Sequence, residues 1–271
     1  EALKSIISFI RYAKAEYVVL ADCYQVCNID FKPIFQQHFE TKADITCVYR
    51  ETDINIDDYS PVVMMEVDEN KMVVKMDIQK SFVGHANVST DTWIIKKDLL
   101  QSLVTQAIER NQHSFNRDIL KENLGNLKIC GYKFNGYFGN ISSLQSYYKV
   151  NMDLLNNCIR DELFYQPGRA IYTRVRDSAP TKYGDHAKIK DSLIADGCII
   201  DGTVENSVLF RGVQISQGAV VKKSILMQNT IIREGISVNR VIADKFVSIA
   251  HTKSIGGQNG ELIYIKKDGV L

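Results

Sequence analysis

The sequence predicts an α/β domain followed by a parallel β-helix, and three observations support this fold class. The chain has 271 residues, of which 45% are hydrophobic, which is enough for two domains with buried cores. Helix and strand patterns alternate through the first half of the chain, as they do in α/β domains. A repeat with a step of 15 to 17 residues then begins near residue 188.

The first half contains helices and strands in alternation. Helices are expected where apolar residues recur every three or four positions, and strands where short apolar runs end at turn residues. The expected helices lie near residues 3–10, 31–42, 99–108 and 143–155. The expected strands lie at 17–21, 44–49, 62–67, 72–76 and 127–134, and the third and fourth form a hairpin. Alternation of this kind indicates a largely parallel sheet.

The repeat sets the pattern from about residue 188 onward. Ser192, Ser207 and Ser224 begin similar segments spaced by 15 and then 17 residues, and Val241 follows 17 residues later. Within each period, aliphatic residues recur about every six positions, with Gly or Asn at the corners. Three such six-residue units per coil would build a triangular parallel β-helix. The alternative is an ordinary β-sandwich, but its strands would not step by about 17 residues.

Stacked coils place aliphatic side chains in ladders, so the repeat also predicts which residues are buried. We expect the following five to be mostly buried: Ile194, Val208, Ile225, Ile231 and Val247.

A connecting segment separates the two halves. The runs QPG at 166–168 and AP at 179–180 contain two of the four prolines in the chain. The predicted organisation is therefore an α/β domain at 1–158, a linker at 159–187 and a β-helix at 188–271.

The composition argues against several classes of protein. The chain has 33 basic and 32 acidic residues, a balance that does not favour a polybasic nucleic-acid or membrane surface. No apolar stretch approaches the roughly 20 residues of a membrane-spanning helix. No second pair completes a zinc site with Cys23 and Cys27, so the six cysteines indicate reduced thiols in a cytoplasmic protein. Because the first residue is Glu1 and not Met, we expect a fragment or an incomplete chain.

Five segments are distinctive enough to compare with known families. Two lie in the repeat, ADGCII at 195–200 and VENSVLFRGV at 204–213. The run SYYKVNMDLL at 146–155 is nearly as specific, and AIYT at 170–173 and APTKY at 179–183 fall in the connecting segment. Together they resemble the ADP-glucose pyrophosphorylase (glucose-1-phosphate adenylyltransferase) family over nearly the whole chain.

The resemblance implies a fold and an activity. It implies a partial Rossmann-like nucleotidyltransferase domain, with the N-terminal part and its Gly-rich phosphate loop absent from this sequence, and a left-handed β-helix. Members of the family make ADP-glucose and pyrophosphate from ATP and glucose 1-phosphate, and they form tetramers. Mg²⁺ held by carboxylates offsets the repulsion between the two anionic substrates.

Two positions correspond to the metal-binding aspartates of the family. Asp22 follows the strand at 17–21, where it is either a remnant of the metal site or a strand-end residue that bonds a loop. Counted from Ala21, Asp22 comes one position earlier than the aspartate in the Gly-Asp-His of the family. Asn140 falls where the family has the aspartate of a Trp-Arg-Asp-Val-Gly segment, and an amide brings no negative charge to a metal. Both catalytic positions are therefore interpreted as degenerate, and Mg²⁺ binding is doubtful.

The sugar-phosphate positions also depart from the family. The Glu-Lys-Pro of the family becomes Gln79-Lys80-Ser81, in which Lys80 is still able to meet a phosphate. Its Ser-Met-Gly becomes Ser89-Thr90-Asp91, and Asp91 places a negative charge where an anionic substrate should bind. Lys80, Ser89 and Asp91 are the candidate substrate-binding residues.

These departures favour the non-catalytic regulatory subunit that some bacteria pair with an active one in glycogen synthesis. The expected partner is then an active glucose-1-phosphate adenylyltransferase subunit in a hetero-oligomer, a tetramer by resemblance, with a small-molecule effector as a further candidate. The alternative is an active adenylyltransferase whose phosphate loop lies in a missing N-terminus. A β-helix acyltransferase would need a histidine within the coils, whereas His251 lies at their end.

Overall fold

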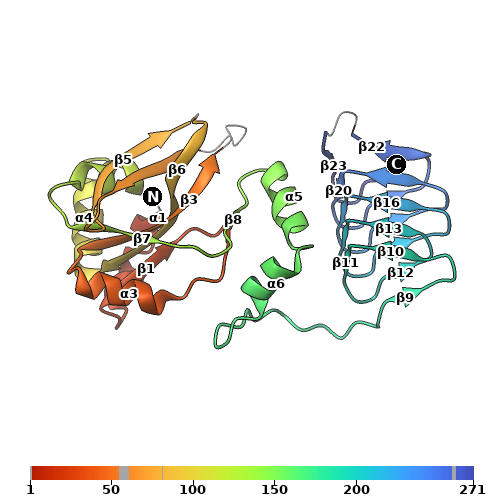
Figure 1. Ribbon diagram of the computed structural model, residues 1–271, viewed down its shortest axis with the longest axis horizontal. Coiled ribbons are helices and arrows are strands. Elements are labelled where there is room, and N and C mark those ends of the chain that lie inside the picture. Colours follow the sequence, from red (N-terminus) through yellow and green to blue (C-terminus); the bar gives the residue numbers. More distant parts are fainter. Residues whose placement is uncertain (1, 55–60, 81, 258–260) are drawn as a thin grey trace. The chain divides into compact units, whose positions relative to one another are not determined.

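The computed structural model describes residues 2–54, 61–80, 82–257 and 261–271. The chain forms two compact units, Glu1–Phe138 and Gly139–Leu271 (Figure 1). The helix predicted at 143–155 belongs to the second unit, and the domain limits predicted at 158 and 187 stay a prediction. No helix in the described part of the chain is long and apolar enough to cross a membrane.

The first unit is a six-stranded mixed sheet with helices. Its strands are β1 (Tyr17–Ala21), β3 (Ile45–Ile54), β4 (Val62–Val67), β5 (Val73–Gln79), β6 (Gly84–Lys96) and β7 (Ile129–Lys133). Its helices are α1 (Ala2–Ser5), α2 (Ile7–Tyr12), α3 (Phe31–Glu40) and α4 (Lys97–Glu109), with a π-helical turn η1 (Phe115–Leu120) and a short 3-10 turn η2 (Lys121–Asn123). The strand order is β5-β4-β6-β3-β7, and β1 also pairs with β6. The α/β class is confirmed.

The prediction of a largely parallel sheet was wrong. Among the described strands of this sheet, only β3 and β7 pair in parallel, and the other pairs are antiparallel. The physical reason is the 13-residue strand β6, which the sequence patterns did not reveal because its first half is mostly polar. The hairpin β4–β5 was predicted, and its short turn allows only antiparallel pairing. Because β6 lies between β3 and β4, it adds antiparallel neighbours on both sides.

Both faces of this sheet are covered by apolar side chains. On one face α4 packs Leu100, Leu103 and Val104 against β3, β5 and β6 in the main core. On the other face α3 packs Ile34 against Val48 of β3 and Ile94 of β6. The two cores fix the positions of the strand ends, where the predicted site residues lie.

The second unit begins with a two-residue strand and two helices and continues as a parallel β-helix. The first elements are β8 (Gly139–Asn140), α5 (Leu144–Asp153) and α6 (Asn157–Phe164). The first sheet of the β-helix contains β10 (Lys188–Lys190), β13 (Thr203–Glu205), β16 (Val220–Lys222), β19 (Ser237–Asn239) and β22 (Ser254–Gly256). The second contains β11 (Leu193–Ile194), β14 (Val208–Leu209), β17 (Ile225–Leu226), β20 (Val241–Ala243) and β23 (Ile263–Ile265). The third contains β9 (Lys182–Tyr183), β12 (Ile199–Ile200), β15 (Gln214–Ile215), β18 (Ile231–Ile232) and β21 (Ser248–Ile249).

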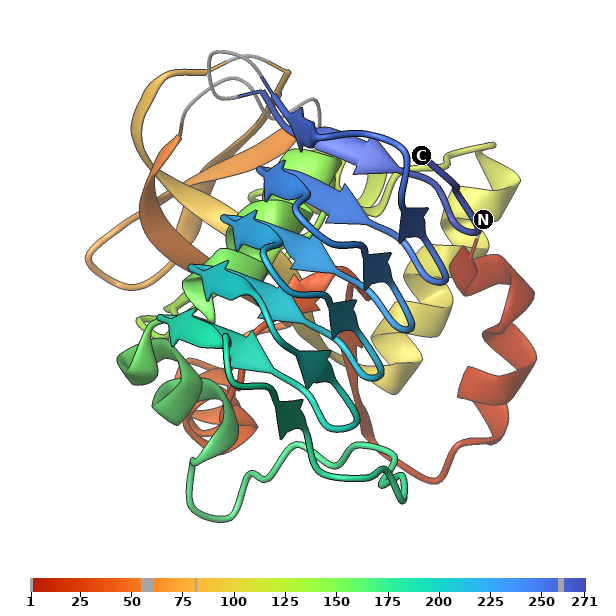
Figure 2. The same cartoon turned by 90° about the vertical axis from the view of Figure 1, so that its right-hand side faces the viewer.

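The coils stack directly on one another (Figures 1 and 2). All strand pairs of the three sheets are parallel, and Val208 pairs with Ile225, which pairs with Ile242. The register therefore follows the 15- and 17-residue steps of the sequence. The predicted left-handed β-helix of hexapeptide repeats is confirmed.

One residue in each short strand points into the β-helix and its neighbour points out. Leu209 and Leu226 are fully buried in the interior core, together with Ile232 and Val247. The predicted burial of Val208 and Ile225 is confirmed, but these two residues do not belong to the interior core. They are buried, but in a separate cluster on the outer face of the coils. The predicted burial of Val247 is confirmed, whereas Ile194 and Ile231 are only half-buried.

Helix α5 covers the outer face formed by Val208, Ile225 and Ile242. The Tyr148 ring of α5 is buried in this cluster, and its hydroxyl donates a hydrogen bond of 2.8 Å to the Lys223 carbonyl. The Arg240 guanidinium lies 5.4 Å from the centroid of the same ring. The helix resembling the family and the repeat therefore form one packed structure, which explains why an outward-facing row of this β-helix is aliphatic.

The serines that revealed the repeat form a ladder of hydrogen bonds at one corner. Ser207 and Ser224 are fully buried, and each hydroxyl donates to the carbonyl two residues earlier. Ser207 Oγ accepts from Ser224 N, and Ser224 Oγ accepts from Val241 N, both at 3.1 Å. The preceding residues, Asn206 and Lys223, take φ values of 46°. The hydroxyls thus satisfy backbone groups that the sharp corner would otherwise leave unpaired.

The adjacent residues Ile231 and Ile232 test which side chain of a short strand points into the β-helix. We predict that Ile232→Ala lowers the free energy of unfolding of the β-helix by about 2–5 kcal/mol, because it opens a cavity in the interior. Ile231→Ala should cost about 1 kcal/mol or less, because Ile231 is half-buried on the outer face. Urea unfolding followed by circular dichroism measures both. Equal losses, or a larger loss for Ile231→Ala, would contradict the register.

Candidate functional site

Two carboxylates lie at neighbouring strand ends in the first unit. β1 pairs antiparallel with β6, and the register aligns Ala21 with Thr92. Asp22 follows Ala21, and Asp91 precedes Thr92, so the pairing brings these two residues to the same place on the sheet. Two predicted site residues that are 69 positions apart in the sequence are therefore neighbours in the structure.

Asp91 occupies a bulge in β6. Between the paired residues Val48 and Tyr49 of β3, the partner on β6 changes from Thr92 to Ser89, which leaves Thr90 and Asp91 as extra residues. Asp91 takes a φ of 50°, a left-handed conformation that glycine adopts without strain. Bulges of this kind occur near functional sites because they redirect side chains.

The side chains around the bulge hold Asp91 in place. The Asn116 amide donates a hydrogen bond of 3.1 Å to Asp91 Oδ1, and the Asp91 amide donates to Ser89 Oγ at 3.0 Å. Ser89 is buried, so its hydroxyl is committed to the bulge. Thr92 Oγ1 donates to the side-chain carbonyl of Gln25 at 3.1 Å, which joins the strand β2 (Gln25–Val26) to the same edge.

The two carboxylates make this site unfavourable for negative charge. Burial raises the pKa of Asp91, and the charge of Asp22 raises it further, although hydrogen bonds from Asn116 and Ser89 act in the opposite direction. Burial also raises the pKa of Asp22. The pKa of Tyr24 is raised first by Asp22 and also by Asp91, so its hydroxyl faces the same negative potential. No cation is among the groups that shift the pKa of either aspartate.

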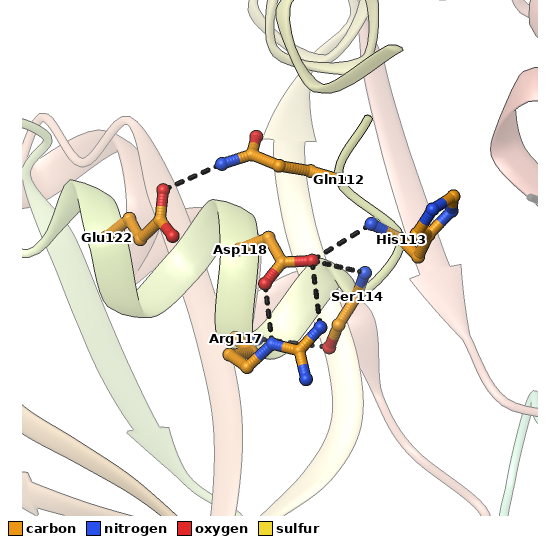
Figure 3. A network of polar contacts seen from close by, with 6 residues as sticks. All are labelled: Gln112, His113, Ser114, Arg117, Asp118 and Glu122. Carbon is orange, nitrogen blue, oxygen red and sulfur yellow. Dashed lines mark hydrogen bonds and ion pairs between the residues drawn. The ribbon is translucent and has the colours of Figure 1, made fainter. Parts of the chain in front are cut away.

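A hydrogen-bonded loop next to the bulge carries Asn116. The Asp118 carboxylate accepts hydrogen bonds of 2.9 Å from the backbone amides of His113 and Ser114 (Figure 3). It also accepts from Arg117 Nε at 2.6 Å. These bonds hold the pKa of the buried Asp118 far below its usual range. Sequence reasoning missed this loop, although Ser114 and Asp118, four residues apart, are residue types that often bond nearby backbone amides.

Of the three predicted substrate-binding residues, Ser89 and Asp91 lie at this bulge, whereas Lys80 lies at the end of another strand. Lys80 follows β5 and is exposed, and Ser81 lies outside the described residues. A groove of about 460 Å³ lies beside it, lined by Gln79, His85, Lys75 and neighbouring residues. Lys75 is paired with Glu66 at 2.7 Å, so the groove holds no excess positive charge from that side chain. The groove is therefore poorly suited to a phosphate.

The second degenerate position, Asn140, belongs to the second unit. It lies in β8 and is exposed. Its unit starts at Gly139, so the structure describes Asn140 separately from Asp22 and Asp91. The side chain at this position is therefore an amide that reaches solvent.

The described residues do not fit a metal site built by the protein. Nowhere in residues 2–54, 61–80, 82–257 and 261–271 do three His, Cys, Asp or Glu side chains gather as a ligand set. Asp22 and Asp91 supply two carboxylates, but Asn116 directs its amide N–H, not its oxygen, at Asp91. A Mg²⁺ ion bound by so few protein groups would depend on substrate phosphates for its other ligands. We derive no catalytic step through a metal.

Comparisons with known proteins agree with the predicted resemblance. The GlmU-like, C-terminal hexapeptide family model matches residues 178–262. The glycogen biosynthesis protein GlgD of Bacillus subtilis (strain 168) is 29% identical over 261 residues, which is 96% of this chain and 65% of that protein. GlgD of Geobacillus stearothermophilus is 31% identical over 79% of this chain and 52% of its own length. The resemblance to the ADP-glucose pyrophosphorylase family is confirmed.

Enzymes of the same family match nearly as well. The glucose-1-phosphate adenylyltransferase of Clostridium perfringens (strain 13 / Type A) is 29% identical over 229 residues, which is 83% of this chain and 57% of that enzyme. The chain spans between about half and two thirds of the length of these relatives. The relatives thus include both glycogen biosynthesis proteins and adenylyltransferases, and identity alone does not separate a regulatory role from a catalytic one.

Asp91 provides a test of the electrostatics of this site. A raised pKa means that the folded state binds the proton more tightly than the unfolded state, whose reference value is 3.8. The stability from protonated Asp91 is therefore complete below about pH 3.8 and is lost as the pH rises through the folded-state pKa. We predict that Asp91→Asn, which keeps the acceptor for Asn116, stabilises the first unit at pH 7 but not at pH 3.5.

Unfolding followed by the fluorescence of Trp93, the single tryptophan, measures this effect in the first unit. Glu69→Gln, at an exposed turn, is the control and should change stability little at either pH. A destabilising effect of Asp91→Asn at pH 7 would mean that the charged carboxylate is compensated.

Proposed function

We propose that this chain is part of a regulatory subunit of glucose-1-phosphate adenylyltransferase in glycogen biosynthesis and has little or no catalytic activity of its own. The observation that carries this proposal is the pair of neighbouring carboxylates, Asp22 and Asp91, because no cation of the described residues is among the groups that shift the pKa of either one. The similarity to two GlgD proteins supports it.

The reaction of the family requires the opposite electrostatics. A sugar phosphate must approach the α-phosphorus of ATP, so both substrates bring negative charge to one place. Two like charges 4 Å apart repel by about 4 kcal/mol at an effective dielectric constant of 20. Asp91 adds such a charge at a position where the family has a glycine, and Asn140 removes one from a position where the family has a metal ligand. Both changes weaken the binding of anionic substrates and of the Mg²⁺ that would offset them.

An active adenylyltransferase remains the second candidate, because the chain is similar to such enzymes over most of its length. In that case a phosphate loop elsewhere in the protein would supply the missing positive charge. The carboxylate pair argues against it, because the pKa of both Asp22 and Asp91 is raised, mainly by burial, and no described cation is among the groups that shift either pKa.

The proposed partner is an active adenylyltransferase subunit in a cytoplasmic hetero-oligomer, a tetramer by resemblance. The end of the β-helix supports this association, because β22 and β23 are the last strands of their sheets among the described residues, and strand edges can pair with another chain. The outer face of the third sheet adds exposed aliphatic surface. Ile199 of β12 is 49% exposed, and Ile231 of β18, two coils further along, is half-exposed. Sedimentation of the chain with the partner subunit tests the association, and monomers alone and in the mixture would contradict it.

Pyrophosphate release from ATP and glucose 1-phosphate with Mg²⁺ tests the proposed function. We predict little or no turnover by the full-length protein alone, and a changed effector response or apparent substrate affinity of the partner in the mixture. Asn140→Asp alone should not restore turnover, because Asp91 still repels the sugar phosphate. Turnover near the rate of the partner would overturn the regulatory assignment, and so would a mixture that behaves as the sum of its parts.

A further inference from the structure

A cavity of about 230 Å³ lies in the first unit between α1, α4 and the loop that leads into η1. Its walls are mainly apolar, with Val104, Ala107 and Ile108 from α4 and Phe115 and Ile119 from η1. The volume is below the range of about 300–1,000 Å³ that is typical of sites for drug-sized ligands. Only a small molecule would fit. None of the residues that the sequence pointed to as a site lines this cavity.

The wall formed by residues 112–119 is fixed before any ligand arrives. Asp118 is 8% exposed and accepts hydrogen bonds from the amides of His113 and Ser114 and from the Arg117 side chain (Figure 3). Gln112 donates to Glu122 at 2.8 Å, which anchors the start of the loop. A preformed wall lowers the ordering cost of binding, so it favours a ligand site over a flexible gap.

The charge at the rim selects the ligand. Lys4, His113 and Asn111 line the cavity, and no Asp or Glu is among the described residues that line it. The Asp118 carboxylate is engaged by the backbone and by Arg117, so its charge is compensated within the loop. We propose that this cavity is a binding site for a small amphipathic anion, with an apolar ring or branched chain inside and one negative group at Lys4.

The same loop connects the cavity to the strand-end carboxylates. Phe115 lines the cavity, and its ring centroid lies 5.0 Å from that of Trp93 on β6. The next residue, Asn116, donates to Asp91. A ligand that fixes Phe115 therefore acts on Trp93 and on the residue that holds Asp91. The site would give the first unit an effector input, and this inference does not rest on the proposed function.

The single tryptophan makes the binding measurable. The probe is 3-phenylpropionate, whose phenyl ring and single carboxylate match the apolar walls and the rim, titrated while Trp93 emission is recorded. We expect a saturable change with a dissociation constant of about 1 mM, as expected for so small a ligand. The neutral analogue 3-phenylpropan-1-ol should bind at least about threefold more weakly.

Two variants and a matched control make the result decisive. Ile108 is 40% exposed at the cavity wall, so Ile108→Glu adds a carboxylate there and should weaken 3-phenylpropionate by at least about tenfold. Lys4→Gln, on an exposed residue, should weaken it several-fold without changing the apolar walls. Val74→Glu adds the same charge at a 57% exposed position that does not line the cavity and should leave binding unchanged. No saturable change up to about 10 mM, or equal binding by parent, Ile108→Glu and Lys4→Gln, would overturn the proposal.

Discussion

The pairing of β6 with its neighbours is the constraint on which the first unit depends. This strand pairs with β3 along its length, with β4 in its first half and with β1 in its second half. Thr92, Trp93 and Ile94 send alternate side chains to the two faces of the sheet, so both cores rely on the same register. The bulge at Thr90 and Asp91 changes that register between the halves. It also brings Asp91 beside Asp22, and the electrostatics of the candidate site follow from this placement.

In the second unit the equivalent constraint is the stacking of similar coils in register. Because each coil hydrogen-bonds to the next, one register repeats from coil to coil, and an inward-facing position stays inward. The outward-facing row of Val208, Ile225 and Ile242 would leave apolar surface exposed without α5, whose Tyr148 covers it. The segment at 146–155, which resembles the family, is therefore also a structural element of the β-helix. Its sequence is constrained by packing as well as by any function.

Much of this architecture was predictable from the sequence, and the exceptions have physical causes. The 17-residue step revealed the β-helix because stacked coils require it, but a period of six does not tell which of two adjacent aliphatic residues points inward. Ile231 and Ile232 illustrate this, because they are adjacent isoleucines of one strand and yet only Ile232 is fully buried. Strand β6 was missed because bulges and polar residues break the alternation on which strand prediction relies. Asp22 and Asp91 were each named from the sequence, but their proximity depends on the β1–β6 pairing, and the contact of Asn116 with Asp91 carried no signal in the sequence.

The central claim is that the strand-end site repels anionic substrates because Asp22 and Asp91 are uncompensated. Calorimetric titration of glucose 1-phosphate into the protein in the presence of Mg²⁺ tests it most directly, with Asp91→Gly as the matched variant that restores the glycine of the family. The account predicts no saturable binding by the parent up to about 10 mM and tighter binding by Asp91→Gly. Submillimolar binding by the parent that Asp91→Gly leaves unchanged would contradict the account.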